Sequence, residues 1–398
     1  MPLDDLFIQK PEDSSNCSKL CAEYIGGPWI NLKDSEFECK LVPGGLCNRV
    51  FVCTNKKLTG KGTTKMPEKV LVRTYGSDFV GRRGDMVNVD DAALPLIQEI
   101  LWEKGLGPKL FGVFDGGRIE EFIEHDNIDP KKRQEMDYLS EIMKKIALVH
   151  SLEMPISKKP YGVFNLVKKW FQDGRDNNEL LFKPGSVEPE LEKYREELAS
   201  FDWAKEMDWF EKCLPLVNSR PVFNHNDIQY ANIFLRRDGK TLEEKIFIFD
   251  YENCSYGFRG YDLAFFLYAK SVDFFAPEFW KNVFWPEQSD ICHLLAVYMT
   301  YHFKNLPTID PEVDTLEHLC MEVDFFLLLV LLLRLCVCYK KLSNTFQEVL
   351  HYSNTEIARY NERKKILLQK YPFLAGIEDV QNGKDNFDKF NSIMKWLA

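Results

Sequence analysis

The sequence predicts an α+β protein with two lobes, a small β-rich N-terminal lobe and a large, mainly helical C-terminal lobe. Its 398 residues, 45% of them hydrophobic, suffice to bury a large core. Short β-prone runs fill residues 37–122, and apolar residues at helical spacing prevail after Pro130. We therefore expect an N-terminal extension over residues 1–36, an N-terminal lobe over residues 37–123 and a C-terminal lobe over residues 124–398.

The N-terminal lobe is expected to combine strands with one helix. Valine-rich runs at residues 50–52 and 70–72 predict strands, because branched side chains pack well on a pleated surface. Apolar residues at helical spacing predict a helix over residues 90–104. Two further strands are expected over residues 110–114 and 118–123, with a glycine turn between them.

The C-terminal lobe is expected to be helical around one buried core. One apolar stripe is formed by Leu139, Ile142, Met143, Ile146 and Val149. The polar stretch 173–190 is interpreted as a surface excursion, and residues from about 277 onward as helical to the end. The apolar run 325–337 is too short to span a membrane and is interrupted by Arg334. We interpret it as a helix buried inside the lobe.

Charge and cysteine content exclude several classes of protein. A formal net charge of −10 argues against nucleic acid as a partner, because a basic face would supply most of the affinity. The N-terminus lacks the features of a signal peptide, so the eleven cysteines are expected as reduced thiols in the cytoplasm. No CxxC pair is present, and a zinc site is not expected.

The segment from His225 to Asn232, with Asp250 behind the apolar run 246–249, carries the most informative pattern. An Asp, an Asn five positions later and an Asp at a strand end are typical of kinase-type phosphoryl transfer. Asp227 is predicted to orient and deprotonate the attacking hydroxyl and to contact the substrate. Asn232 and Asp250 are predicted to bind magnesium. A lone Asp commonly caps a turn, but the combination favours catalysis.

Other residues near this loop receive supporting roles. His225 is expected to steady the loop through a hydrogen bond rather than transfer a proton. Asp262 is expected to hold the loop as a buried carboxylate that accepts backbone N–H groups. Gln229 is a candidate contact for the nucleotide or the substrate, and Glu252 for the metal or the substrate.

Two features of the N-terminal lobe predict contacts with the phosphates of a nucleotide. The turn Gly44-Gly45-Leu46-Cys47-Asn48 joins two β-like runs, and glycines let backbone N–H groups approach phosphate oxygens. Arg73 follows a buried run, where a strand cation held by a helix carboxylate pairs with phosphates in kinase-like sites. A simple hairpin turn and a solvated edge arginine are the structural alternatives.

The sequence resembles the choline/ethanolamine kinases from about Phe37 to near Lys370. The matching motifs are Gly44-Gly45-Leu-x-Asn48, Val72-Arg73-x-Tyr75-Gly76, Gly105-Leu106-Gly107-Pro108-Lys109-Leu110, Gly117-Arg118-Ile119-Glu120, His150-x-x-Glu153-Met154-Pro155, His225-Asn226-Asp227-Ile228-Gln229 with Asn232, Asp250-Tyr251-Glu252 and Tyr256-x-x-Arg259-Gly260-Tyr261-Asp262. The resemblance implies a protein-kinase-like bilobal fold, with a nucleotide-binding N-terminal lobe and a catalytic C-terminal lobe. It also implies ATP and Mg²⁺ as cofactors, and Glu121 and Ile123 as nucleotide contacts.

This resemblance further implies phosphorylation of the hydroxyl of choline or ethanolamine, the first step of phosphatidylcholine and phosphatidylethanolamine synthesis. Two departures from the family concern the nucleotide site. Leu94 stands where family members carry a helix Glu that pairs with the strand Arg, and Asp90 and Asp91 are candidates to replace it. Cys47 stands where Ser or Thr is usual.

The expected substrate pocket departs further. Leu327 and Val330 align with two tryptophans that resemble a choline-binding wall, and Asn253 aligns with a tyrosine. Each aromatic face contributes roughly 0.5–2 kcal/mol to binding a quaternary ammonium, so their loss weakens the case for choline. Phe274 is expected to keep one aromatic face, and Glu252 a negative charge.

Three hypotheses follow. The first is a cytoplasmic kinase for choline or ethanolamine, without a transmembrane segment. The second is a nucleotide-binding pseudokinase, motivated by Leu94 and the altered pocket. The third is a related phosphotransferase acting on another small hydroxylated molecule, such as an aminoglycoside-type compound. The sequence leaves the choice between choline and ethanolamine open, and a homodimer is the assembly considered.

Overall fold

The structure, a computed structural model, describes residues 12–42, 48–60, 66–75, 93–177, 179–272, 283–306, 308–341 and 346–377. The chain divides into two compact units. Unit 1 holds the described residues up to Asp126 together with Arg236–Asp238, and unit 2 holds the described residues Asn127–Leu235 and those from Gly239 onward. The domain boundaries predicted at residues 36 and 123 stay predictions. Each unit is described by itself.

Unit 1 is built on a five-stranded antiparallel sheet in the order β1-β2-β3-β5-β4. Its strands are β1 (Phe37–Val42), β2 (Asn48–Asn55), β3 (Lys69–Tyr75), β4 (Leu110–Phe114) and β5 (Gly117–Glu121). In β2, residues 51, 53 and 55 are buried and the residues between them only partly so, as expected for a strand with one face on a core. The predicted strands of this region are therefore present.

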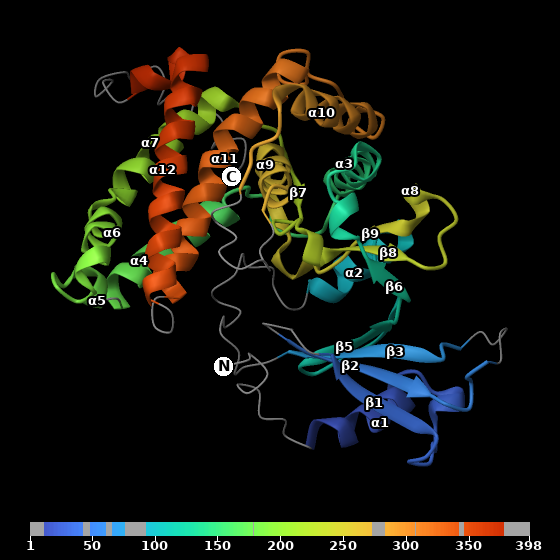
Figure 1. The fold of residues 1–398 in the computed structure, drawn as a ribbon. Coiled ribbons are helices and arrows are strands. Elements are labelled where there is room, and N and C mark those ends of the chain that lie inside the picture. Colours follow the sequence, from blue (N-terminus) through green and yellow to red (C-terminus); the bar gives the residue numbers. More distant parts are fainter. Residues whose placement is uncertain are drawn as a thin grey trace. The chain divides into compact units, whose positions relative to one another are not determined.

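Helix α1 (Glu12–Tyr24) and the short helix η2 (Gly27–Trp29) cover one part of this sheet (Figure 1). These two helices and the sheet enclose a small core that contains Cys17, Cys21, Trp29, Phe51, Cys53, Val70, Val72 and Ile119. The Trp29 indole N–H donates to the backbone oxygen of Pro67 at 3.1 Å, so its polar atom is satisfied inside the core. Residues 12–36 of the segment expected as an extension thus pack as part of unit 1. The remaining elements of this region are α2 (Leu94–Glu103) and β6 (His125–Asn127).

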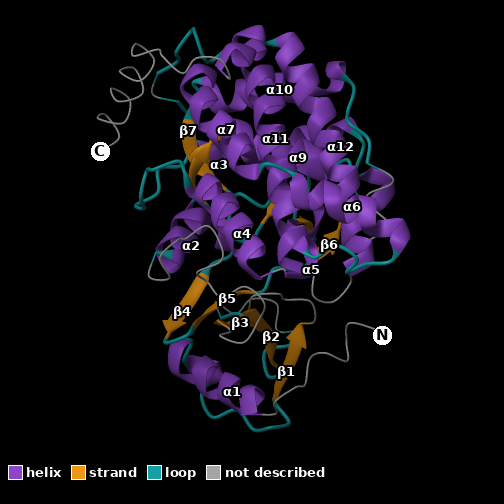
Figure 2. Cartoon of the chain, turned by 90° about the vertical axis from the view of Figure 1, so that its left-hand side faces the viewer, coloured by secondary structure: helices purple, strands orange, loops and turns teal. Residues whose placement is uncertain are grey.

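Unit 2 is mainly helical (Figure 2). Its helices are α3 (Met136–His150), α4 (Gly162–Asn177), α5 (Glu179–Phe182), α6 (Pro189–Ser200), α7 (Trp203–Val217), α8 (Leu242–Lys245), α9 (Arg259–Ala269), α10 (Gln288–Phe303), α11 (Leu316–Lys341) and α12 (Phe346–Lys370). Short 3-10 turns are η4 (Pro130–Lys132), η5 (Tyr230–Asn232), η6 (Tyr251–Asn253) and η8 (Pro372–Ile377). Helix α11 packs against α4, α9 and α12, and α10 packs against α3.

Two small antiparallel strand pairs position the loops of unit 2. Strand β7 (Pro221–Asn224) pairs with β10 (Ser255–Phe258), and β8 (Ile233–Arg236) pairs with β9 (Ile246–Ile248). All three residues of β9 are buried, and Ile246 and Ile248 belong to the core of unit 2. The loop that follows β7 and the turn that follows β9 carry the predicted catalytic residues.

Most helical predictions are confirmed, and the differences concern the stretch 173–190 and the first residue of α2. The apolar run 325–337 belongs to α11, whose residues 325–332 are buried in the core of unit 2. This confirms the buried-helix interpretation, and among the described residues no helix is long and apolar enough to span a membrane. The stretch 173–190 is not simply a surface excursion, because α4 continues to Asn177 and Leu181 of α5 is fully buried. Helix α2 begins at Leu94, inside the predicted range 90–104.

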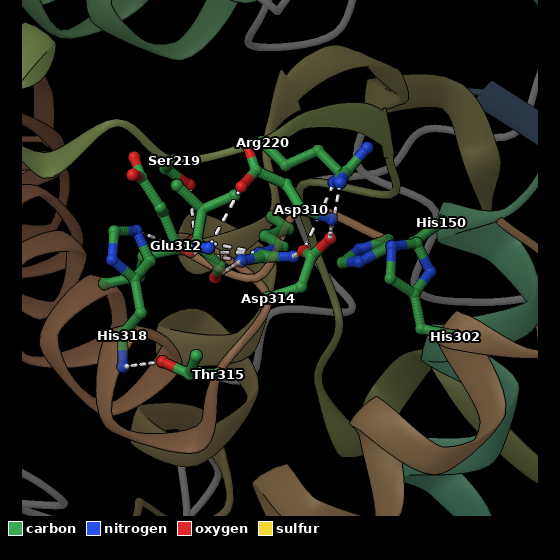
Figure 3. A network of polar contacts seen from close by, with 12 residues as sticks. His150, Ser219, Arg220, His302, Asp310, Glu312, Asp314, Thr315 and His318 are labelled. Carbon is green, nitrogen blue, oxygen red and sulfur yellow. Dashed lines mark hydrogen bonds and ion pairs between the residues drawn. The ribbon is translucent and has the colours of Figure 1, made fainter. Parts of the chain in front are cut away.

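A buried ionic network joins α9 to α11 (Figure 3). We call Arg220, Arg259, Asp314 and Glu322 the helix cluster. Arg259 donates to Asp314 Oδ1 at 2.5 Å and to Glu322 Oε1 at 2.7 Å, and Arg220 donates to Asp314 Oδ2 at 2.5 Å. Two cations meet two anions, so the formal charges of these four residues balance. Helices α9 and α11 approach closely here, because a Cβ on Gly260 would lie 2.5 Å from the Phe326 ring.

Candidate active site

One carboxylate binds the backbone of the loop from His225 to Gln229. Asp262, in the first turn of α9, is fully buried and accepts the backbone N–H of His225 at 2.6 Å and that of Asn226 at 2.8 Å. Hydrogen bonds to an ionised carboxylate are stronger than neutral ones, and two consecutive amides fix the direction of the loop. The prediction that Asp262 holds the loop is confirmed.

Buried side chains from two further helices support Asp262. His150, the last residue of α3, lies with its Nε2 3.3 Å from Asp262 Oδ2 and its Nδ1 2.9 Å from the Tyr298 hydroxyl of α10. His302 stacks on Tyr298 at a ring distance of 5.0 Å. Burial, together with His150 and Arg259, lowers the pKa of His302 to about 3, so this imidazole is neutral. The loop therefore rests on a dry, packed base.

Asp227 and Asn232 are brought into direct contact. The Asn232 Nδ2 donates to the backbone oxygen of Asp227 at 2.9 Å and to Asp227 Oδ2 at 3.0 Å. Gln229 Nε2 donates to the other carboxylate oxygen, Oδ1, at 3.0 Å. Burial raises the pKa of Asp227, although His225 and these amide donors counteract it. A carboxylate oriented in this way can align a hydroxyl group and accept its proton.

Asp250 follows Phe249, whose backbone N–H and backbone oxygen both form hydrogen bonds with the loop. Phe249 donates its N–H to the backbone oxygen of Asn232 at 3.1 Å, and the Phe249 oxygen lies 2.9 Å from His225 Nε2. His225 therefore steadies the loop through a hydrogen bond, as predicted. Asp250 itself adopts the left-handed conformation with φ of 71°. Its Oδ1 is buried and has no hydrogen-bond partner within the described residues.

Asn226 is a supporting residue to which sequence reasoning gave no role. It adopts a left-handed conformation with φ of 66°, which Asn tolerates better than most residues. Its Nδ2 donates to the backbone oxygen of Asn253 at 2.8 Å and to Ser255 Oγ at 2.9 Å. These bonds tie the loop to the turn that follows Asp250. The only sign of this role in the sequence was its position between His225 and Asp227.

Unit 1 contains a second buried group of charges, which we call the sheet cluster and define as Arg73, Arg118 and Glu120. Arg73 Nη2 donates to Glu120 Oε1 at 3.2 Å, and Arg118 Nε donates to Glu120 Oε2 at 2.8 Å. Burial alone would raise the pKa of Glu120, but the two guanidinium groups outweigh it and lower this pKa to about 2.

The carboxylate that contacts Arg73 thus comes from a neighbouring strand rather than from a helix. Arg73 and Arg118 are directly opposite in the β3–β5 register, and Glu120 lies two residues beyond Arg118 on the same face. Sequence reasoning named Glu120 as part of a family motif and missed this contact. Asp90 and Asp91, the candidates named to replace the helix Glu, lie outside the described residues, and Leu94 is a buried residue of α2.

Several predicted nucleotide contacts can be placed only in part. Gly44, Gly45 and Leu46 lie outside the described residues, and Asn48 is the first residue of β2. Glu121 forms the end of β5, where its N–H donates to the backbone oxygen of Lys109 at 2.8 Å.

Ile123 lies just beyond β5, and its backbone oxygen is 2.7 Å from His125 Nδ1. The nucleotide-binding roles of these residues stay predictions.

The predicted substrate contacts are also only partly placed. Glu252 is a half-buried residue of η6, two positions after Asp250, whereas Phe274 lies outside the described residues. Leu327 and Val330 of α11, which align with a tryptophan wall, are 3% and 0% exposed and belong to the central core of unit 2. These two positions therefore contribute to packing.

Comparison with solved structures identifies the class of protein. A choline kinase from Cryptosporidium parvum matches with a TM-score of 0.65 and 20% identity, covering 92% of this chain and 100% of that one. An ethanolamine kinase from Plasmodium vivax matches with a TM-score of 0.58 and 18% identity, covering 90% of this chain and 98% of that one. These matches confirm the predicted α+β, protein-kinase-like fold.

Sequence comparison then defines the family. The profile described as choline/ethanolamine kinase matches residues 39–361. Choline kinase alpha of Mus musculus is 29% identical over 329 residues, which cover 77% of this chain and 71% of that protein. A choline/ethanolamine kinase of Homo sapiens is 32% identical over 246 residues, which cover 61% of this chain and only 57% of that protein. The chain belongs to the choline/ethanolamine kinase family, and the predicted class of an alcohol-acceptor phosphotransferase is confirmed.

Proposed function

We propose that this protein transfers the γ-phosphoryl group of ATP to the hydroxyl group of choline or ethanolamine. One observation carries the proposal. The carboxylate of Asp227 lies between two amide donors, Asn232 and Gln229, at 3.0 Å each, in a loop whose backbone is bound by Asp262. Phosphoryl transfer needs mainly positioning and electrostatic stabilisation, and a fixed carboxylate supplies the positioning.

Asp227 acts on the acceptor. Its carboxylate aligns the hydroxyl group with the phosphorus atom and accepts the hydroxyl proton as the new P–O bond forms. The amide donors of Asn232 and Gln229 hold both carboxylate oxygens at 3.0 Å, so the side chain loses little freedom when substrate binds.

The residues beside Asp227 fit a magnesium ion. Mg²⁺ prefers oxygen ligands, and Asp250 offers a buried carboxylate oxygen without a hydrogen-bond partner in the described part of the chain. Asn232 uses its amide nitrogen toward Asp227, which leaves its oxygen as a ligand atom. We therefore assign Asn232 and Asp250 to Mg²⁺, which when bound neutralises charge on the phosphates.

Arg73 is assigned to the phosphates of ATP. Its guanidinium is largely buried, with 11% of the side chain exposed, and Glu120 orients it. An oriented guanidinium binds phosphate oxygens in a fixed geometry. Gly44, Gly45 and Leu46, which lie outside the described residues, and Asn48, the first residue of β2, are assigned to the same phosphates through their backbone N–H groups.

For the acceptor we retain choline and ethanolamine. Relatives of this chain carry the names of both activities, choline kinase and ethanolamine kinase. Glu252, close in sequence to Asp250, is assigned to the ammonium group, and Phe274 to its apolar side. The nine cysteines whose side chains the structure describes are all free thiols, which supports a reducing compartment such as the cytoplasm.

The test is phosphotransfer from ATP to choline, ethanolamine, their methylated intermediates and an aminoglycoside. We expect Asp227→Asn to lower kcat for the amino alcohol by about 10³-fold, in the range of general-base catalysis, with ATP binding retained. Asp202→Asn is the matched control, because Asp202 caps α7 through the N–H of Lys205 at 3.0 Å and takes no part in the reaction.

Three other outcomes would contradict the proposal. Near-normal turnover of Asp227→Asn would refute the role of Asp227. Activity on the aminoglycoside alone would favour the related phosphotransferase. ATP binding without transfer to any acceptor would favour a pseudokinase.

A further inference from the structure

Four cysteines of unit 1 gather at one place between α1 and the sheet. Cys17 and Cys21 are one helical turn apart on α1, so their side chains share one face of that helix. Cys39 of β1 and Cys53 of β2 are directly opposite partners in the antiparallel register, so their side chains share one face of the sheet. The helix face and the sheet face meet at these residues.

The sulfur atoms are close enough to share one ion. The Cys17, Cys39 and Cys53 sulfurs all lie within 4.8 Å of one another, and the Cys39–Cys53 distance is 3.9 Å. Cys21 also lies within interaction range of the Cys53 thiol. A tetrahedral zinc site with Zn–S bonds of about 2.3 Å requires sulfur atoms about 3.8 Å apart. The observed spacing needs little contraction to reach that value.

The burial and the number of these cysteines favour a metal-binding site over an ordinary packing role. Cys17, Cys21 and Cys53 are at most 1% exposed, and Cys39 is half-buried. A single buried cysteine is an ordinary small core residue. Four that converge from two elements form a complete set of soft ligands, which selects zinc among divalent ions.

We propose that Cys17, Cys21, Cys39 and Cys53 bind one structural Zn²⁺ ion that clamps α1 to the β1–β2 hairpin. This proposal is independent of the proposed kinase activity, because none of the four residues belongs to the catalytic loop. It revises the sequence-based expectation that a zinc site is absent, which relied on the missing CxxC spacing. It also gives the described residues 12–24 of the N-terminal segment a role, namely to fix the β1–β2 pair.

The experiment measures zinc in the full-length chain purified with a reducing agent and without chelators. We expect about one zinc ion per chain by mass spectrometry of the metal, as a closed tetrathiolate site requires. The double variant Cys17→Ser/Cys39→Ser should lose this zinc. The matched control is Cys292→Ser/Cys320→Ser, because the Cys292 and Cys320 sulfurs are also 3.9 Å apart but lie in unit 2 without two further cysteines beside them in the described residues.

A second measurement keeps the proposal testable if the double variant fails to fold. Cobalt added to the zinc-depleted wild-type chain should produce the intense visible absorption of tetrahedral thiolate coordination, which zinc then displaces. Zinc removal by a chelator should lower the Tm of the wild-type chain and leave that of a folded double variant unchanged.

Three results would overturn the proposal. The first is a reduced chain that takes up neither zinc nor cobalt. The second is equal zinc content in wild-type and the Cys17→Ser/Cys39→Ser variant. The third is a disulfide among the four cysteines in the freshly purified chain, detected by alkylation and peptide mass mapping, which would assign the cluster to redox chemistry instead.

Discussion

The sheet cluster of unit 1 and the helix cluster of unit 2 are both buried groups of charges, yet they differ in balance. In the sheet cluster two guanidinium groups share the single carboxylate of Glu120. In the helix cluster Arg259 and Arg220 meet two carboxylates, Asp314 and Glu322, which also bind a serine and a backbone N–H. The balanced helix cluster suits a structural role, whereas the guanidinium of Arg73, with 11% of its side chain exposed, remains accessible enough to meet an anion.

The largest effect should come from breaking the helix cluster. Arg259→Met leaves two buried carboxylates without their main cation, and we expect a loss of about 3–5 kcal/mol in the free energy of unfolding. Chemical denaturation followed by circular dichroism measures it. Arg236→Met is the control, because Arg236 pairs with an exposed Asp238 and should cost at most about 1 kcal/mol. Equal losses in the two variants would show that the helix cluster is not structural.

The sheet cluster should respond in activity rather than in stability. Arg73→Met leaves Glu120 paired with Arg118, so the fold should tolerate it, while kcat/KM for ATP should fall about 10–100-fold. Lys69→Met on the same strand is the control, because Lys69 makes a half-exposed ion pair with Glu124 and lies over the Phe122 ring, away from Glu120. If Arg73→Met unfolded the protein and left the kinetics of the remaining folded fraction unchanged, the distinction between the clusters would fail.

Acidification should affect the two regions in different pH windows. His302, beside the loop base, has a folded pKa of about 3 against an ordinary value of 6.5, so the unfolded chain binds the extra proton and stability falls as pH drops below 6.5. The expected loss between pH 7.5 and pH 5 is about 2 kcal/mol. Glu120, with a folded pKa of about 2 against 4.5, contributes stability that is lost only below pH 4.5.

Calorimetry across this pH range tests both windows. His302→Gln removes the titrating group and should flatten the decline between pH 6.5 and 5, and His351→Gln, on an exposed face of α12, is the control. A decline that begins only below pH 4.5 in the wild-type chain would contradict the assignment of His302.

The smallest expected effect concerns one hydroxyl group. Ser219 donates to Glu322, which keeps Arg259 as its main partner, so Ser219→Ala should cost about 1 kcal/mol in the free energy of unfolding. The exposed Ser200→Ala is the control. In combination with Arg259→Met the two losses should not add, because both residues act through Glu322. Strict additivity would show that they are independent.

Sequence reasoning identified the elements whose signal is local. Asp227, Asn232 and Asp262 were assigned from the short motifs that contain them, and hydrogen bonds join Asp227 to Asn232 and Asp262 to the loop backbone as expected. The buried run of α11 was recognised because hydrophobic content and the interruption by Arg334 are visible in sequence.

Features that depend on register or on packing between distant elements were missed. The Arg73–Glu120 pair arises from the alignment of β3 with β5, which no spacing along the chain reveals. The cysteine cluster combines a helical spacing of four with a cross-strand pair, so it matches no linear zinc motif. The hydrogen bonds of Asn226 to the turn after Asp250 likewise required the folded loop.

The left-handed backbone at Asn226 and Asp250 restricts which sequences can evolve at these positions. Both residues lie where a β-branched or bulky side chain would be strained, and only Asn, Asp and Gly adopt this geometry at low cost. We therefore expect a mutational library of this enzyme to yield few folded variants with substitutions at these two positions. Variation that alters acceptor choice therefore has to come from positions other than these two.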